Sequence, residues 1–283
     1  MALTVNTNVT SLNVQKNLNK ASDALSTSMT RLSSGLKINS AKDDAAGLQI
    51  ATRMTSQIRG QTMAIKNAND GISIAQTAEG AMQESTNILQ RMRELAVQAR
   101  NDSNSGDDRV ALNKEFAQMS DELTRIANST NLNGKNLING DAGTMTFQVG
   151  SNSGADNQIT ITLSDSFDAV QLGVDSDAIA VTGTDSDTAE ASFAAAIDAI
   201  DAALKTINTS RADLGAAQNR LTSTISNLQN INENASAALG RVQDTDFAAE
   251  TAQLTKQQTL QQASTAVLAQ ANQLPSAVLK LLQ

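Results

Sequence analysis

The stretch LQQASTAVLAQANQLPSAVLKLL, residues 260–282, decides the fold expected for this chain. Its apolar and small side chains recur in a 3/4 alternation, which is the spacing of a coiled-coil seam. Four of these residues are seven apart and three fill the intervening positions: Leu260, Val267, Leu274 and Leu281, with Ser264, Ala271 and Val278. No charged residue lies between Lys256 and Lys280. The stretch is too polar to span a membrane and too poor in charge for a free surface, so we expect it to pack against other copies or partners.

The start of the chain mirrors this pattern. Leu18, Leu25 and Leu32 are seven residues apart, with small or apolar residues between them. A thin seam of this kind holds a lone helix only marginally in water, so the two ends of the chain are expected to pair. The predicted self-assembly seam consists of Leu18, Leu25, Leu32, Leu260, Val267, Leu274, Val278 and Leu281. Pro275 predicts a kink or an early end of the last helix.

The composition narrows the classes of function. Aromatic residues make up only 2% of the 283 residues, and there is one proline, which favours long helices with thin aliphatic seams. The net charge is −8, with no basic stripe, so nucleic acid is not expected as a partner. The chain contains no cysteine and no histidine, which excludes disulfides, thiolate nucleophiles, imidazole bases and the usual zinc ligands. We therefore predict no catalytic, metal or cofactor site.

Three sets of paired carboxylates are candidates for a functional site. Asp43 and Asp44 follow an interruption of the helical pattern and are predicted to cap a new helix rather than to perform acid–base or metal chemistry. The Asp-x-Asp pairs at 175/177 and 185/187 lack the glycine and the distal glutamate of a calcium loop, so they are predicted to be solvated turns.

The pattern along the chain predicts a mainly α fold, a long coiled-coil helical rod with a small β-hairpin in its middle. Residues 144–149 and 158–163 alternate with a period of two and predict the hairpin. The most regular heptads lie in the returning helix, at Ile200, Ile207, Leu214, Leu221 and Leu228. The expected regions are a terminal helix at 1–45, half of the rod at 46–139, the hairpin and a short exposed tip at 140–190, the other half of the rod at 191–240, and a terminal helix at 241–283.

Three long motifs then match a known family. They are RLSSGLKINSAKDDAAG at 31–47, NANDGISIAQTAEG at 67–80 and LAQANQLP at 268–275. In this order they resemble bacterial flagellin, the subunit of the flagellar filament, and the similarity extends over about residues 1–140 and 195–283. The interval between Ile179 and Ala189 is too short for the outer domains of larger flagellins, so the resemblance implies a short form with little or no outer variable domain.

This resemblance implies a structural role. The chain would form a homopolymer, a helical filament used for swimming, with the paired terminal helices lining its inner tube. It implies an extracellular location on the flagellum, with export by the flagellar secretion apparatus and no cleaved signal peptide. Residues 1–20 indeed lack the basic and apolar regions of a secretory signal. The implied partners are a flagellar export chaperone on the C-terminal segment and the hook-associated junction and cap proteins. No cofactor and no membrane insertion are implied.

One segment also resembles a site read by a host. QRMRELAVQ, residues 90–98, is similar to the flagellin segment recognised by a vertebrate Toll-like receptor. The resemblance implies contacts through Arg91 and Leu95, with Glu115 as a third. The alternative is purely structural, because Arg91 and Glu94 at i,i+3 form an ordinary helix-surface pair and Leu95 continues a core face.

Other readings predict different features. A hook–filament junction protein would share the ends of flagellin but would cap the hook instead of propagating. A soluble coiled-coil signalling module would form one continuous antiparallel helical pair, which the alternating segments at 144–149 and 158–163 disfavour. An enzyme is disfavoured most, because without histidine or cysteine only carboxylates remain, and none is set in a recognisable pocket pattern.

Overall fold

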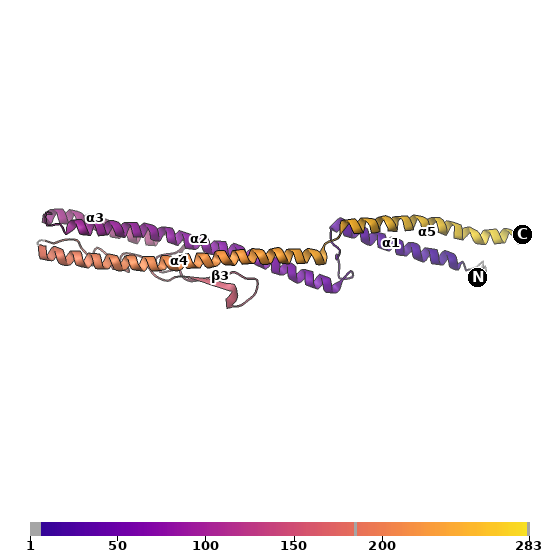
Figure 1. Cartoon of the computed structure of the whole chain (residues 1–283), viewed down its shortest axis with the longest axis horizontal. Helices are drawn as coiled ribbons and strands as arrows, with labels where there is room; N and C mark the ends of the chain where they lie inside the picture. Colours follow the sequence, from indigo (N-terminus) through magenta and orange to yellow (C-terminus); the bar gives the residue numbers. More distant parts are fainter. Residues whose placement is uncertain (1–6, 184–185, 282–283) are drawn as a thin grey trace. The chain divides into compact units, whose positions relative to one another are not determined.

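The computed structural model describes residues 7–183 and 186–281. Its elements in chain order are α1 (Val9–Ser34), α2 (Ala45–Ala99), α3 (Gly106–Ser129), β1 (Asn131–Leu132), β2 (Lys135–Asn136), β3 (Gly143–Gln148), the short 3-10 helix η1 (Ala155–Asn157), β4 (Gln158–Leu163), α4 (Ser186–Gln243) and α5 (Phe247–Leu281) (Figure 1). The predicted class, mainly α with a small β region in the middle of the chain, is confirmed. None of the described helices is both long enough and apolar enough to cross a membrane.

The chain divides into two compact units. Unit 1 comprises Met1–Ile58 and Glu233–Gln283, and unit 2 comprises Arg59–Asn232. Helices α2 and α4 therefore contribute residues to both units.

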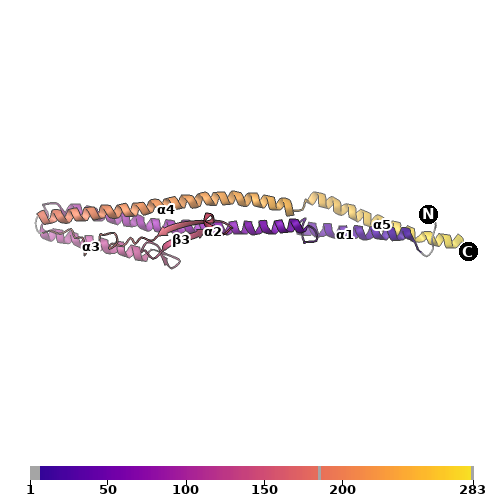
Figure 2. The same ribbon diagram turned by 90° about the horizontal axis from the view of Figure 1, so that it is seen from below.

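Unit 1 is built around α1 and α5, which lie side by side (Figures 1 and 2). The Asn8 side chain caps α1 by accepting a hydrogen bond from the Ser11 amide at 3.1 Å, and Gly35, with φ 72°, ends the helix in the left-handed conformation. Asp246 caps α5 by accepting from the Ala248 amide at 2.9 Å.

The last helix does not end at its proline. α5 continues past Pro275 to Leu281, so the early end predicted there is not observed. A proline removes one backbone donor and crowds one turn, and the helix continues through it because good helix formers such as Leu279 and Lys280 follow.

Unit 2 is held together by a continuous apolar core under α2, α3 and α4. The predicted heptads of α4 are confirmed, because all five positions are buried: Ile200, Ile207, Leu214, Leu221 and Leu228. α2 and α3 supply the largest core side chains opposite them, which are Met82, Leu89, Met92, Phe116 and Leu123. At one seam position that holds a polar residue, Gln218 Nε2 donates to Glu79 Oε2 at 2.9 Å, which satisfies both groups.

Two sets of polar interactions stabilise the corner between α2 and α3. Ser105 and Asp108 form a capping box at the start of α3. Arg109 is buried, and its Nε donates to the carbonyl of Ala99 at 3.0 Å while its Nη1 donates to the carbonyl of Gly183 at 3.1 Å. Arg109 thus ties the end of α2 to the segment that leads into α4, a role that no sequence pattern predicted.

The β-hairpin predicted in the middle of the chain is confirmed. β3 and β4 pair antiparallel from Gly143↔Leu163 to Gln148↔Gln158. One face of β4 is buried against the core through Ile159, Ile161 and Leu163, as the alternation requires. A second, smaller hairpin, β1–β2, surrounds the turn dipeptide Asn133–Gly134.

The segment from 164 to 183 contains no strand of its own and covers the core with turns. Asn139 and Ser166 form an isolated β-bridge, and Phe167, Val174 and Val181 are buried. The Val181 amide donates to Asn113 Oδ1 at 2.8 Å, which fixes this segment to α3.

Candidate functional site

The α1/α5 pair of unit 1 is the candidate assembly site. The two helices are antiparallel, because the start of α1 contacts the later part of α5 and the end of α1 contacts its beginning. Asn8 Nδ2 donates to the Ala271 carbonyl at 2.8 Å, and Ser11 Oγ donates to Asn272 Oδ1 at the same distance. At the other end the Arg31 guanidinium lies 3.7 Å from the Glu250 carboxylate.

The seam between these helices is narrow and partly polar. From α1, the predicted residues Leu18, Leu25 and Leu32 are half-buried along it. From α5, the residues turned inward recur in a 3/4 alternation: Leu254, Gln257, Gln261, Ser264, Leu268 and Ala271. The described α1 and α5 side chains that are fully buried are all small or polar, namely Ala21, Ser28, Gln257 and Ala271. Such a seam excludes little apolar surface from water, so it stabilises the pair weakly.

The larger apolar residues that the sequence placed in the α5 seam lie elsewhere. Leu260 and Val267 are 44% and 51% exposed, so they flank the seam instead of filling it. Ser264 and Ala271, which the sequence placed between them, do face α1. The side chains of Leu274, Val278 and Leu281 lie outside the described residues.

The reason for the difference is that α5 carries two heptad rows next to each other. Leu254, Gln261 and Leu268 are spaced by seven just as Leu260 and Val267 are. Periodicity alone cannot decide which row turns toward α1, and Leu260 and Val267, the described members of the first row, remain outside. The signal that the sequence reading missed was therefore the second row, in which a glutamine stands between two leucines.

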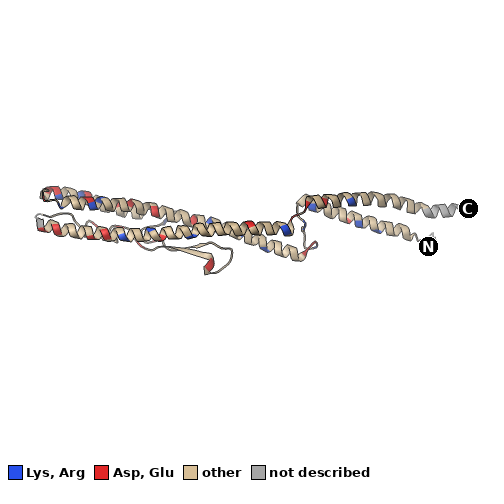
Figure 3. Cartoon of the chain, viewed as in Figure 1, with Lys and Arg blue, Asp and Glu red and all other residues tan. Residues whose placement is uncertain are grey.

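The α1/α5 pair thus displays a set of exposed apolar side chains. On α1 they are Val9, Leu12 and Met29, each more than half exposed, and on α5 they are Phe247, Leu260 and Val267. We call these six residues the outward apolar set. Both helices carry few charges around them (Figure 3). An uncharged surface with exposed leucine, valine and methionine is typical of a surface that another protein covers.

The joint that follows α1 is held by a short antiparallel contact. Leu36 and Asp244 form a β-bridge, the Lys37 amide donates to the Gln243 carbonyl at 2.7 Å, and the Thr245 amide donates to the Gly35 carbonyl at 2.9 Å. The chain therefore enters and leaves the α1/α5 pair at one point.

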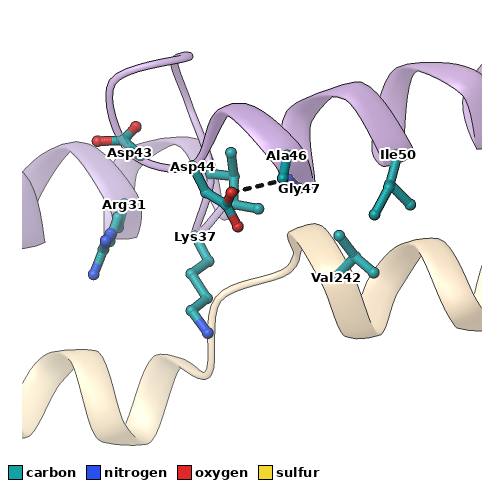
Figure 4. A pocket seen from close by; sticks show the side chains of 9 residues that line it. Arg31, Lys37, Asp43, Asp44, Ala46, Gly47, Ile50 and Val242 are labelled. Carbon is teal, nitrogen blue, oxygen red and sulfur yellow. Dashed lines mark hydrogen bonds between the residues drawn. The ribbon is translucent and has the colours of Figure 1, made fainter.

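Asp44 caps α2, as predicted, whereas Asp43 stabilises the turn before the helix and does not cap it. Asp43 Oδ2 accepts from the Ser40 amide at 2.9 Å, from the Ser40 hydroxyl and from the Asn39 amide, and these bonds lower the pKa of Asp43. Asp44 Oδ1 accepts from the Gly47 amide at 2.9 Å in the first turn of α2 (Figure 4). A cavity of about 500 Å³ lies beside them, lined also by Arg31 and Lys37. The described residues include no group of three side chains able to hold a metal ion.

The predicted host-contact residues lie in unit 2, on α2 and α3. Arg91 Nε and Nη2 donate to Glu115 Oε1 at 3.1 and 2.8 Å, and Arg91 Nη1 donates to Glu94 Oε2 at 3.0 Å. The bond to Glu115 is the largest cause of the raised pKa of Arg91. Leu95, in contrast, is fully buried in the core. Arg91 and Glu115 are therefore brought together at the surface, and the Leu95 side chain is turned away from it.

Comparison with known proteins identifies the family. The model of the bacterial flagellin N-terminal helical region matches residues 5–142, and that of the C-terminal helical region matches residues 197–282. Flagellin B of Vibrio cholerae is 42% identical to this chain over an alignment that covers 100% of both chains. Flagellin A of Vibrio anguillarum is 40% identical with the same coverage. Both alignments are longer than the 283 residues of this chain, so these relatives contain residues that it lacks.

A solved structure supports the fold. The putative flagellar hook-associated protein from Vibrio parahaemolyticus aligns with a TM-score of 0.59, covering 71% of this chain and 100% of that one, at 13% identity. At this identity the likeness shows a shared fold and does not distinguish a filament subunit from a junction protein. The family models and the full-length identity do make that distinction. The chain belongs to the bacterial flagellin family.

Proposed function

We propose that this flagellin polymerises through the outward apolar set of its α1/α5 pair. The family makes the chain a structural subunit of the extracellular flagellar filament, which is a self-assembling polymer. The proposal adds which residues of unit 1 meet neighbouring copies. Leu274 and Leu281 continue the Leu260–Val267 row in the sequence and are proposed to extend the same contact, whereas Val278 continues the Ser264–Ala271 row and is proposed to extend the seam with α1.

One observation carries this proposal: the fully buried described residues of the α1/α5 pair are small or polar, while several of its large apolar residues are exposed. Ala21, Ser28 and Gln257 lie inside, whereas Leu12 and Val267 lie outside. Burying a leucine or valine side chain stabilises a contact by about 1.5–3 kcal/mol. In the isolated chain these side chains are exposed and contribute no such stabilisation. Contact with other copies would bury them and stabilise the polymer.

Seeded growth of filaments tests the proposal. Purified monomer is added to short filament seeds, and growth is followed by light scattering with electron microscopy of the product. The double variant Leu260→Asn/Val267→Asn is compared with Val170→Asn, which makes the same kind of change at an exposed valine of unit 2. A chain lacking residues 245–283 serves as the fully defective reference. Circular dichroism checks that the helix content of the point variants is unchanged.

We expect the double variant to keep its helix content and to lose elongation, while Val170→Asn elongates as the parent chain does. Normal elongation of the double variant would exclude these residues from the assembly contact. If the parent chain stopped on the seed ends without elongating, it would behave as a junction protein instead.

The remaining partners are proposed from the family. An export chaperone would cover the C-terminal segment before assembly, since exposed Leu260 and Val267 otherwise favour premature association. Export unfolded through the flagellar secretion apparatus, without a cleaved signal peptide, fits a chain that contains no cysteine to form disulfides. N-terminal sequencing of chains from assembled filaments tests the export route, because a cleaved signal would remove the first residues. Junction and cap proteins would contact the two ends of the filament.

Recognition by a vertebrate Toll-like receptor is proposed through Arg91 and Glu115. Their support is the ion pair that holds the Arg91 side chain at the surface, 46% exposed. Arg91→Ala is expected to lower receptor signalling by monomer, whereas Arg125→Ala, which removes an arginine paired to Glu122 at i,i+3 on α3, is expected to leave it unchanged. Equal signalling by both variants would argue against this site.

A further inference from the structure

The chain contains two Asn-Gly dipeptides, and the structure places them in contrasting environments. Asn133–Gly134 forms the exposed turn of the β1–β2 hairpin. Asn139–Gly140 is half-buried, next to the β-bridge between Asn139 and Ser166. We propose that Asn133 is a site of spontaneous deamidation and that Asn139 is protected from the same reaction by its contacts.

The reaction needs a backbone nitrogen that can reach the side-chain carbonyl carbon before it. The Gly134 nitrogen attacks Asn133 Cγ, forming a new C–N bond, and the bond from Cγ to Nδ2 breaks. Ammonia leaves with the proton that the Gly134 nitrogen gives up, and a five-membered succinimide remains. Water then opens the ring at either carbonyl, which yields aspartate or isoaspartate. No oxidant or reductant takes part, and glycine is the most permissive second residue because it has no side chain in the way.

The geometry at Asn133 favours this attack. Both residues of the turn are exposed, and no hydrogen bond of the described residues engages the Asn133 carboxamide or the Gly134 amide. Among the described residues other than glycine, Asn133 alone has a positive φ, at 54°. Because both residues of the turn are exposed, few neighbouring groups oppose the rotation that brings the Asn133 carboxamide to the Gly134 nitrogen.

The geometry at Asn139 opposes the attack. Its Nδ2 donates to Asp141 Oδ2 at 2.6 Å, and its Oδ1 accepts from the Asp141 amide at 3.1 Å, so both ends of the carboxamide are held. A Cβ on Gly140 would lie 3.4 Å from Ser166 Cβ, so Gly140 lies against the segment that contains Ser166. A reaction that needs the carboxamide to rotate onto the next amide is slowed when that group is fixed in another orientation.

The product would alter the turn itself. Isoaspartate adds one atom to the main chain inside a two-residue loop whose flanking pair is Leu132↔Lys135. The hairpin lies between Thr130, the C-cap of α3, and Leu137, whose amide donates to the Thr130 carbonyl at 3.0 Å. Both products also add one negative charge to a chain of net charge −8. The fraction of converted chains would therefore increase with the age of the protein. In each converted chain the altered turn would loosen the end of α3.

Peptide mapping by mass spectrometry tests the proposal on the full-length monomer. The protein is incubated in mildly alkaline buffer, in its folded state and in urea, and cleavage after Lys135 separates the two dipeptides. In the folded protein we expect roughly tenfold more conversion at Asn133 than at Asn139, with isoaspartate among the products. In urea the two sites should convert at similar rates, since both have the same neighbour on the C-terminal side.

Two variants extend the test. Asn133→Gln, which would need a larger ring, should show no product at that position. Asp141→Ala should release the Asn139 carboxamide and raise conversion there toward that of Asn133. Equal conversion at both sites in the folded protein would overturn the proposal, and so would an Asn133 that stays intact when folded but converts in urea, because the turn would then protect it.

Discussion

The start of α3 shows how one serine and one carboxylate stabilise a helix end. Asp108 Oδ2 accepts from the Ser105 hydroxyl at 2.7 Å and from the Ser105 amide at 3.0 Å, while Ser105 Oγ accepts from the Asp108 amide at 3.2 Å. The first two bonds lower the pKa of Asp108. A carboxyl with a lowered pKa in the folded state stabilises the fold above its unfolded pKa of about 3.9, and this contribution is lost as the pH falls through the folded pKa.

Ser105→Ala is therefore expected to lower the free energy of unfolding by about 1 kcal/mol at neutral pH. Part of this difference from the parent chain should disappear in acid, because protonated Asp108 no longer gains from the serine hydroxyl. Urea unfolding at neutral and at acidic pH measures the loss of stability and its dependence on pH. Ser103→Ala, an exposed serine in the same turn, is the control and should leave stability unchanged. A loss for Ser105→Ala that is the same at every pH would show that Asp108 takes no part in it.

At the scale of elements, the seating of the hairpin on α2 depends on a single glycine. A Cβ on Gly71 would lie 3.2 Å from both Leu221 Cδ1 and Phe147 Cγ, so this glycine lets β3 and α4 approach α2 closely. Gly80, nine residues further along α2, has no atom within 4 Å of such a Cβ. The two glycines occupy the same helix but meet different constraints.

Gly71→Val should destabilise unit 2 by about 1–3 kcal/mol, since the added atoms overpack the contact with Phe147 and Leu221. Gly80→Ala should instead raise stability by roughly 0.5–1 kcal/mol, because alanine loses less backbone entropy in a helix. Thermal unfolding of the two variants measures whether each change lowers or raises the stability. A stabilising Gly71→Val would mean that the hairpin does not rest on α2 in solution.

The two helix pairs should also differ in their protection from amide exchange. The α4 seam buries Ile200, Ile207 and Leu221, whereas the α1/α5 seam buries mainly Ala21 and Gln257. Local opening is easiest where little apolar surface is buried. In the monomer we expect fast exchange in α1 and α5 and slow exchange in α4, and in the filament slow exchange in all three. Strong protection of α1 and α5 in the monomer would show that the pair is stable without neighbouring copies.

The elements differ in how far the sequence could predict them. The α4 heptads and the β3–β4 hairpin have a clear period over many residues, so their buried faces followed from spacing alone. β1 and β2 are two residues each, too short for any period, and only their turn dipeptide was recognisable. Arg109 binds two backbone carbonyls, 10 and 74 residues away, and a carbonyl leaves no mark in the sequence.

The candidate assembly site was predicted in outline only. Which segments form it followed from the heptads at the two ends of the chain, and the half-buried Leu18, Leu25 and Leu32 lie where the pattern placed them. The rotation of α5 about its axis did not follow, because Leu254 and Leu268 compete with Leu260 and Val267 for the seam. The difference between the two rows depends on packing energies that a pattern of residue types does not contain.

At the scale of the whole molecule, charge is distributed unevenly between the two units. Unit 1 contains 9 Lys and Arg against 7 Asp and Glu, and unit 2 contains the remaining 12 against 22. Unit 1 is therefore close to neutral, which agrees with the proposed contacts between copies through its α1/α5 pair. Unit 2 carries essentially all of the net negative charge, so copies brought together in a polymer repel one another mainly through unit 2.

Filament growth should consequently depend on salt. Raising the ionic strength from about 0.01 M to about 0.15 M shortens the Debye length from about 30 Å to about 8 Å, which screens repulsion between the unit 2 surfaces but leaves apolar contacts of unit 1 intact. We expect the lowest monomer concentration that supports seeded growth to fall several-fold over this range. Asp121→Asn with Asp165→Asn, two exposed carboxylates of unit 2, should reproduce part of the effect at low salt, whereas Lys114→Gln should oppose it. A growth threshold that rises with salt would mean that attraction between opposite charges, and not burial of apolar residues, drives assembly.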